Sequence, residues 1–366
     1  MCLYPRLIKN RKYIANKKNG GNIPPVSDLR VLMVPVGCGK CIECKKQKSR
    51  EWSVRLQEEI RHNNNGKFVT LTFSEESLVE LGEDKSINRL NGYNLDNGIA
   101  TLAVRRFLGR WRKKYKKSVK HWLVTELGGK FTERIHLHGI LFTNEDEKTI
   151  EKLWKYGNIK VGNGKEHYVS DKTINYIVKY VNKVDQKHKE YESKILCSPG
   201  IGKGYIIRSD IKNNKFKGKE TNETYTLRDG RKIALPIYYR NKIYTEEEKE
   251  KLWLIKLDKE ERWICGERID IRDNLEDYYK TLEYYRERNK ELGYGNDEKN
   301  WEKRMYENQR RNLKKIERIE LVNERKKMVK PKTEVKKDIP LGKIRQKEMI
   351  KPKTEVKKDI PLGKIE

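Results

Sequence analysis

Two histidines, His136 and His138, stand one residue apart in the segment RIHLHGILF, residues 134–142. The apolar residues of this segment predict a β-strand, and the side chains of a strand alternate between its two faces. Both imidazoles therefore project from one face, roughly 6.6 Å apart along the strand, a spacing that suits one divalent ion. Because a His-x-His motif is short, two ordinary polar residues on an exposed strand face are the competing interpretation.

Glu126 ends the preceding predicted strand, residues 121–127. Residues 128–130, Gly-Gly-Lys, predict a turn, so we expect the two strands to pair antiparallel and to bring Glu126 beside the histidines. Imidazole and carboxylate ligands together suit Mg²⁺ or Mn²⁺ bound to phosphate oxygens. The three side chains therefore predict a metal site for phosphodiester chemistry.

Two tyrosines lie one turn apart on a predicted helix, residues 171–184. An apolar stripe of this helix faces the sheet and consists of Ile174, Ile177, Val178 and Val181. The other side carries Tyr176, Lys179, Tyr180 and Lys183. A phenol is a poor nucleophile at neutral pH, and a nearby ammonium or metal favours its phenolate. The lysines could supply that charge or hold a phosphate, whereas aromatic packing and a solvated basic face are the alternatives.

Paired tyrosines predict a mechanism that a single tyrosine does not support. One phenol attacks a phosphodiester, keeps the 5′-phosphate as a phosphotyrosine and frees a 3′-OH for a polymerase. After a round of synthesis, the second phenol cleaves the regenerated site, and the released 3′-OH attacks the first phosphotyrosine to close a circle. Joining needs no ATP because the phosphotyrosine retains the energy of the broken bond.

Three cysteines, Cys38, Cys41 and Cys44, form a CxxCxxC motif, and Cys2 could complete a four-sulfur site. In a chain without a signal peptide this spacing favours metal binding over disulfides, and a structural Zn²⁺ is the leading interpretation. Free reduced thiols, or DNA contacts by the lysines between the cysteines, are the alternatives.

The chain is strongly basic, with 84 Lys and Arg residues against 54 Asp and Glu residues and a net charge of +30. Such an excess predicts a polyanionic partner, because phosphate binding releases counterions. Charge alone does not separate DNA from RNA or an anionic membrane. The sequence has no apolar run of about 18 residues and no signal peptide, so we expect a cytosolic protein that does not enter the membrane.

The predicted elements belong to an α+β fold, an antiparallel sheet of about five strands with helices packed on its face. Their order, β-α-β-β-α-β, is typical of a ferredoxin-like core. The predicted helices are residues 45–62, 101–117, 146–154 and 171–184. The predicted strands are residues 68–73, 121–127, 134–142, 158–162 and 166–170, with a further strand-like piece at 235–239. Between them, residues 74–100 are expected to be mainly a polar loop, and the Gly-rich 197–205 a turn near the DNA and no nucleotide site, since it lacks the P-loop spacing.

We expect four regions along the chain. Residues 1–62 form a Cys-rich segment and a helix, and residues 63–245 the catalytic domain with a Gly-rich final part. A charged helical extension occupies 246–327. The last region, 328–366, is a basic tail in which residues 328–344 recur at 349–365 with one change, Val329 to Ile350. Such Lys-rich, Pro-bearing repeats cannot bury a core, so the tail is expected to be disordered.

The order of several motifs between residues 1 and 245 resembles a known group of proteins, the replication initiators of the Microviridae, gokushovirus-like branch, in the HUH endonuclease superfamily. The motifs are the Met-Cys start, CGKCIEC at 38–44, SREWSVR at 49–55, FVTLTF at 68–73, RIHLHGILF at 134–142, YIVKYVNK at 176–183, SPGIGKGY at 198–205 and LPIYYR at 235–240.

This resemblance implies a viral, origin-specific, Mg²⁺- or Mn²⁺-dependent nickase and ligase with an HUH fold. It implies Tyr176 and Tyr180 as alternating covalent nucleophiles and His136 and His138 as metal ligands. The implied partners are viral origin DNA, single- and double-stranded, and the host polymerase and helicase, and the implied place of action is the host cytoplasm. At Glu126 the sequence departs from the family, whose acidic residue usually precedes Gly-Tyr-Gly or similar.

Two other interpretations remain open. A plasmid initiator or a single-strand transposase would use the same chemistry in another setting. A non-catalytic basic protein with a zinc knuckle would bind nucleic acid through the same tyrosines by stacking, and replacing them with Phe would then have little effect.

Overall fold

The computed structural model describes residues 2–129, 132–162, 169–272, 274–298 and 301–329. Lys130 of the predicted turn, most of the predicted strand 166–170 and the repeat-bearing tail from residue 330 lie outside the described residues. Met1–Asn323 form one compact unit, and the chain from Glu324 forms another. Of the helices within the described ranges, none is long and apolar enough to cross a membrane.

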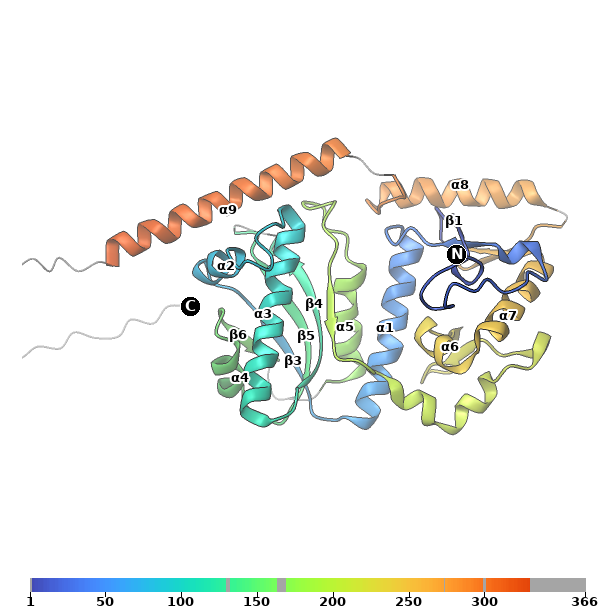
Figure 1. Cartoon of the computed structure of the whole chain (residues 1–366), viewed down its shortest axis with the longest axis horizontal. Coiled ribbons are helices and arrows are strands. Elements are labelled where there is room, and N and C mark those ends of the chain that lie inside the picture. Colours follow the sequence, from blue (N-terminus) through green and yellow to red (C-terminus); the bar gives the residue numbers. More distant parts are fainter. Residues whose placement is uncertain (1, 130–131, 163–168, 273, 299–300, 330–366) are drawn as a thin grey trace, which may run out of the picture. The chain divides into compact units, whose positions relative to one another are not determined.

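The centre of the first unit is a five-stranded antiparallel sheet in the order β6-β3-β5-β4-β7 (Figure 1). Its strands are β3 (Gly66–Leu71), β4 (Lys120–Leu127), β5 (Ile135–Phe142), β6 (Ile159–Val161) and β7 (Ile195–Cys197). The first four follow the predicted β-α-β-β-α-β order, which confirms the α+β class. The fifth strand, however, is β7 and not the predicted 166–170, because Ile195–Cys197 pairs with the free edge of β4.

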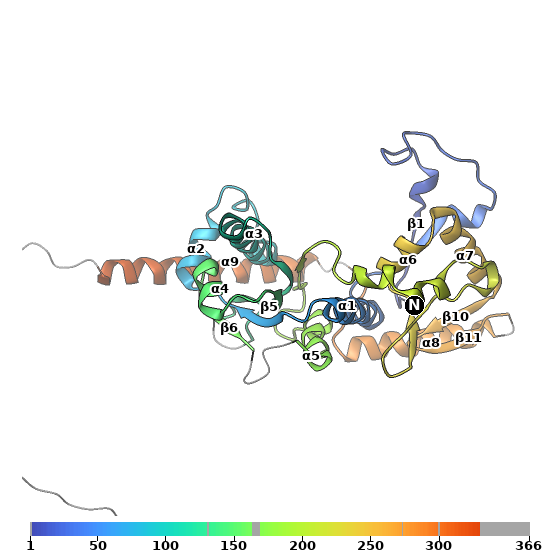
Figure 2. The same ribbon diagram turned by 90° about the horizontal axis from the view of Figure 1, so that it is seen from below.

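Helices cover both faces of this sheet, as Figure 2 shows for α3 and α5 on either side of β5. One face packs against α2 (Glu75–Gly82), α3 (Gly92–Tyr115) and α4 (Glu147–Trp154). The other packs against α1 (Ile42–His62) and α5 (Asp171–Asn182). The expected loop 74–100 was wrong, since it contains α2 and the first turns of α3. Its buried Leu78, Leu81 and Ile99 explain why these turns are helical.

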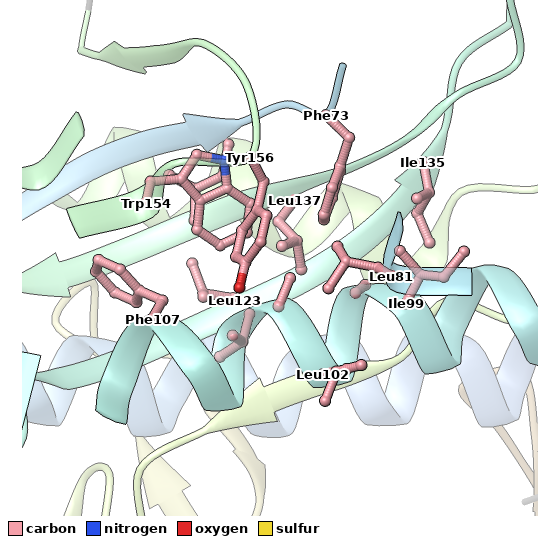
Figure 3. Packing of buried hydrophobic residues seen from close by; sticks show 14 of the residues in the cluster. Phe73, Leu81, Ile99, Leu102, Phe107, Leu123, Ile135, Leu137, Trp154 and Tyr156 are labelled. Carbon is pink, nitrogen blue, oxygen red and sulfur yellow. The ribbon is translucent and has the colours of Figure 1, made fainter. Parts of the chain in front are cut away.

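The larger hydrophobic core lies between the sheet and α2, α3 and α4 (Figure 3). Leu123, Ile135 and Leu137 point from β4 and β5 into this layer. Because alternate residues of a strand face opposite ways, the same alternation turns Glu126, His136 and His138 toward the α1 and α5 side. Burial of the apolar set therefore fixes which face carries the candidate site.

The remaining elements flank α1. They are β1 (Arg6–Lys9), β2 (Met33–Val36), β8 (Thr224–Thr226), β9 (Lys232–Ala234), α6 (Ile237–Ile243), α7 (Glu246–Asp258), β10 (Glu261–Ile264), β11 (Glu267–Asp270), α8 (Leu275–Glu291) and α9 (Trp301–Val329). Two predictions were wrong here. Residues 235–239 begin helix α6 with buried Tyr239, and the helical extension contains the β10–β11 hairpin.

Candidate active site

The site begins with the register of the three central strands. Antiparallel pairing places Glu126 of β4 opposite His136 of β5, and Thr70 of β3 opposite His138. Directly opposed residues of such pairs have their side chains on one face and close together. The strand pairing predicted from the sequence thus brings two histidines, a glutamate and a threonine to one patch of the sheet.

Glu126, His136 and His138 converge on a single point. The Nε2 atoms of His136 and His138 lie 3.0 and 2.9 Å from the same oxygen, Oε2 of Glu126. One potential ligand atom from each side chain lies within 4.8 Å of the other two, so the group could hold a metal ion. Two imidazoles and one carboxylate are a donor set that first-row divalent ions accept.

Outer contacts orient both imidazoles. His136 Nδ1 lies 3.3 Å from the carbonyl oxygen of Arg134 and must donate to it, which leaves Nε2 with its lone pair. His138 Nδ1 lies 3.0 Å from Thr70 Oγ1. Such partners fix the ring of a metal-binding histidine. Neither Thr70 nor the Arg134 carbonyl was identified from the sequence, although the strand register would have indicated Thr70.

The charge state of the group also suits a cation. Burial opposes ionisation of Glu126, but hydrogen bonds from His136, His138 and Lys183 hold its pKa well below the ordinary value. Burial lowers the pKa of His138, against the opposing effect of Glu126, and so favours the neutral imidazole that binds metals.

Helix α5 brings the two tyrosines to this group. It begins after Ser170, whose side chain accepts from the Thr173 N–H in a capping box, and its apolar stripe packs on the sheet. The Tyr180 ring stacks on the His138 ring, with centroids 4.2 Å apart and planes inclined by 5°. Its hydroxyl donates to Tyr176 Oη at 2.8 Å. Tyr180 is thus partly buried at the edge of the stripe, whereas Tyr176 is 49% exposed.

The two lysines of α5 differ in position. Lys183 forms an ion pair with Glu126, while Lys179 is exposed and lines a cavity together with both tyrosines. Burial and the hydrogen bond with Tyr176 raise the pKa of Tyr180 above its ordinary value. Tyr180 therefore carries its proton in this structure, and the nearest lysine is already engaged by a carboxylate.

The metal-binding group lies between two cavities. One, of about 540 Å³, is lined by Tyr176, Tyr180 and other residues of α5. The other, of about 520 Å³, is lined by His136, His138 and mainly polar side chains, among them Thr70, Thr72, Ser74, Thr132, Arg134 and Asn158. A strand that crosses the group could therefore occupy space on both sides of it.

The four cysteines of the N-terminal region also come together. The Sγ atoms of Cys2, Cys38, Cys41 and Cys44 lie within 4.8 Å of one another, and none of these cysteines forms a disulfide. Backbone N–H groups of Tyr4 and Cys38 point at Cys2 Sγ, at 3.3 and 3.2 Å. Two more, from Lys40 and Cys41, point at Cys38 Sγ. The cluster could hold a metal ion at the start of α1.

Comparisons with known proteins agree with the resemblance seen in the motifs. The family model described as replication-associated protein ORF2 matches residues 66–185, which contain the three strand residues and both tyrosines. The chain is 26% identical over 276 residues to the replication-associated protein VP4 of Bdellovibrio phage phiMH2K, a match that covers 68% of this chain and 79% of that protein. It is 28% identical over 199 residues to the replication-associated protein ORF2 of Spiroplasma virus 4, covering 48% and 58%. No solved structure gives a significant match. The chain is thus similar to phage replication-associated proteins.

Proposed function

From the match of residues 66–185 to the replication-associated protein family, we propose that the chain initiates rolling-circle replication of a phage genome. It would bind the viral origin, nick one strand of the double-stranded form, remain attached to the 5′ end, and rejoin the displaced strand into a circle. The observation that carries the proposal is the stacking of Tyr180 on His138 within the Glu126, His136 and His138 group. The proposed place of action is the host cytoplasm.

Glu126, His136 and His138 would hold Mg²⁺ or Mn²⁺. When bound, such an ion polarises the phosphodiester and favours a phenolate nearby. The residues of the chain provide the orientation: the Arg134 carbonyl and Thr70 hold the two imidazoles with Nε2 toward Glu126. Burial keeps His138 in its neutral form.

Tyr180 is the proposed first nucleophile because it lies against the metal-binding group. Its phenol oxygen forms a bond to phosphorus, and the bond between phosphorus and the 3′-oxygen breaks. The net result is a 5′-phosphotyrosine and a free 3′-OH, to which the phenol proton is ultimately transferred. The host polymerase extends this 3′-OH, and a host helicase would separate the strands ahead of it.

The cavities on the two sides of the group support this geometry. In an in-line displacement the attacking and leaving oxygens lie on opposite sides of phosphorus. With Tyr180 on one side, the released 3′ end would occupy the polar cavity lined by Thr72, Arg134 and Asn158. Lys179 and Lys183, at the tyrosine side, would contact phosphate oxygens as point charges.

Tyr176 would perform the second cleavage. Its hydroxyl lies 2.8 Å from that of Tyr180, so a small displacement of the strand would bring the second phenol to the phosphate. The 3′-OH of the displaced strand then attacks the first phosphotyrosine and restores a phosphodiester, while the first tyrosine regains its hydroxyl.

We propose that Cys2, Cys38, Cys41 and Cys44 hold a structural Zn²⁺. Tetrahedral four-sulfur sites of this kind stabilise small folds directly, and N–H groups directed at sulfur favour the thiolate that binds zinc. The ion would join residue 2 to the start of α1, the helix that supports α5.

The experiment that tests the enzymatic proposal mixes the purified full chain with Mn²⁺ and supercoiled DNA of the replicon that encodes it. We expect nicked circles and a protease-sensitive adduct on the 5′ end, both lost in a Tyr176→Phe, Tyr180→Phe double variant. Tyr284→Phe, an exposed tyrosine of α8, is the matched control and should behave as the unmodified chain.

Other outcomes identify the rival functions. DNA binding without nick or adduct, unaffected by EDTA and by the double Phe replacement, would leave a non-catalytic nucleic-acid-binding protein. Nicks without any adduct would indicate a hydrolytic nuclease. A plasmid initiator or transposase would give the same adduct on a different DNA sequence.

A further inference from the structure

The cavity beside the two tyrosines has a second wall from a distant part of the sequence. One side is α5 and the residues that follow it, and the other is formed by Leu292 and Tyr294, just after α8. These two residues lie outside the matched region 66–185. The cavity volume of about 540 Å³ lies within the range of ligand pockets, roughly 300–1,000 Å³.

The turn formed by residues 292–295, hereafter the 292–295 turn, is anchored to the start of α1. The anchor is the fully buried side chain of Asn289. Its Oδ1 accepts from the Ile42 N–H at 2.8 Å, and its Nδ2 donates to the carbonyl oxygens of Tyr294 and Gly295, each at 3.3 Å. One amide side chain therefore fixes the turn to the helix that packs against α5.

Two glycines let the turn approach its neighbours closely. Gly293 has φ +75°, and a Cβ there would lie 3.1 Å from Gln186 Nε2, in the segment that follows α5. A Cβ on Gly295 would lie 3.0 Å from the Cβ of Lys40. The turn is thus a packed wall whose position is set by the same elements that set the tyrosines.

The lining of this cavity is complementary to single-stranded DNA. It contains three aromatic rings, Tyr176, Tyr180 and Tyr294, and two cations, Lys179 and Lys183. Among the described residues, no acidic side chain lines it. Proteins that bind single strands combine aromatic rings, on which bases stack, with cations that contact the backbone.

We propose that the 292–295 turn binds the nucleotide next to the scissile phosphate, with its base stacked on Tyr294 and its phosphates near Lys179 and Lys183. This assignment rests on the proposed function for the identity of the strand. Tyr294 would be a positioning residue, since it holds the strand and does not touch the reacting atoms. The C-terminal extension would then complete the substrate groove of the nuclease domain.

The first test measures binding of a labelled 20-residue oligothymidylate by fluorescence anisotropy, without added metal. We expect Tyr294→Ala to weaken binding roughly 5- to 100-fold, the range for loss of one stacked base. Tyr294→Phe and Tyr294→Trp should stay within about twofold of the unmodified chain, because both retain a ring. Tyr284→Ala, on an exposed face of α8, is the control and should have no effect.

A second measurement separates this inference from the proposed function. Single-turnover adduct formation is followed on nicking-site DNA at rising concentrations. Tyr294→Ala should need more DNA for half-saturation yet reach nearly the full rate. If the unmodified chain forms no adduct, the proposed function fails while the oligothymidylate result stands by itself. Unchanged oligothymidylate binding by Tyr294→Ala, or equal losses in Tyr294→Phe and Tyr284→Ala, would overturn the inference.

Discussion

The Tyr180 ring lies flat against the His138 ring, with centroids 4.2 Å apart, while Tyr176 lies one helical turn away with half of its surface exposed. The two tyrosines therefore differ in their distance from the metal-binding group. A nucleophile held in near-attack geometry reacts faster than one that must first move.

We therefore predict that Tyr180→Phe slows the first cleavage more than Tyr176→Phe does. In single-turnover cleavage of a single-stranded oligonucleotide carrying the nicking site, the difference should be at least about tenfold, equivalent to about 1.4 kcal/mol of barrier. Adducts are quantified on denaturing gels over time. Equal rates for the two variants would mean that the free structure does not set the order of attack.

Thr70 supplies a second prediction through its contact with His138 Nδ1 at 3.0 Å. Thr70→Val preserves the side-chain shape but removes the oxygen. Loss of such a partner typically weakens metal binding about 10- to 100-fold. The Mn²⁺ concentration for half-maximal adduct formation should rise by that factor, and Thr70→Ser should restore it. An unchanged Mn²⁺ requirement would show that Thr70 does not orient the ligand.

Much of this arrangement could be predicted from the sequence, because it depends on local patterns. The alternation in residues 134–142 gave the strand and the common face of the two histidines, and the short turn gave the pairing that brings Glu126 to them. The 3.6-residue period of α5 gave the stripe that packs on the sheet. Local periodicity was sufficient wherever both partners of a contact lie on adjacent elements.

Contacts between distant segments could not be predicted in this way. The fifth strand, Ile195–Cys197, has only three residues and no distinctive pattern, and it forms because β4 offers a free edge. The pairing of Lys183 with Glu126 and the approach of Tyr294 to α5 depend on how separate elements pack. Likewise, α2 lies in a polar stretch and is stabilised by burial of Leu78 and Leu81.

The cysteine cluster leads to a third prediction. Purified under reducing conditions with zinc supplied, the chain should contain one zinc ion per molecule by mass spectrometry of metals. Cys41→Ser, at the most buried of the four positions, should lose that zinc and unfold at a lower temperature. Cys265→Ser is the matched control, since Cys265 packs in the same hydrophobic cluster but lies outside the four-sulfur group. Full zinc content in Cys41→Ser would contradict the assignment.

The last prediction concerns the buried Arg311 of α9, which joins the C-terminal helix to the nuclease domain. Its guanidinium donates to both carboxylate oxygens of Asp96 on α3, at 3.0 and 2.8 Å, and pairs with Glu133 before β5 at 3.2 Å. Arg311 is 3% exposed, so Arg311→Ala leaves two buried carboxylates without this partner.

Breaking a buried ion pair from one side costs about 3–5 kcal/mol. We expect that loss in the free energy of unfolding, measured by urea denaturation with tryptophan fluorescence. Lys314→Ala, which removes an exposed pair on the same helix, should change it by less than about 0.5 kcal/mol. Equal stability of Arg311→Ala and Lys314→Ala would show that α9 does not dock through Arg311. Because the tyrosines lie on α5, away from these carboxylates, adduct formation by folded Arg311→Ala should remain close to that of the unmodified chain.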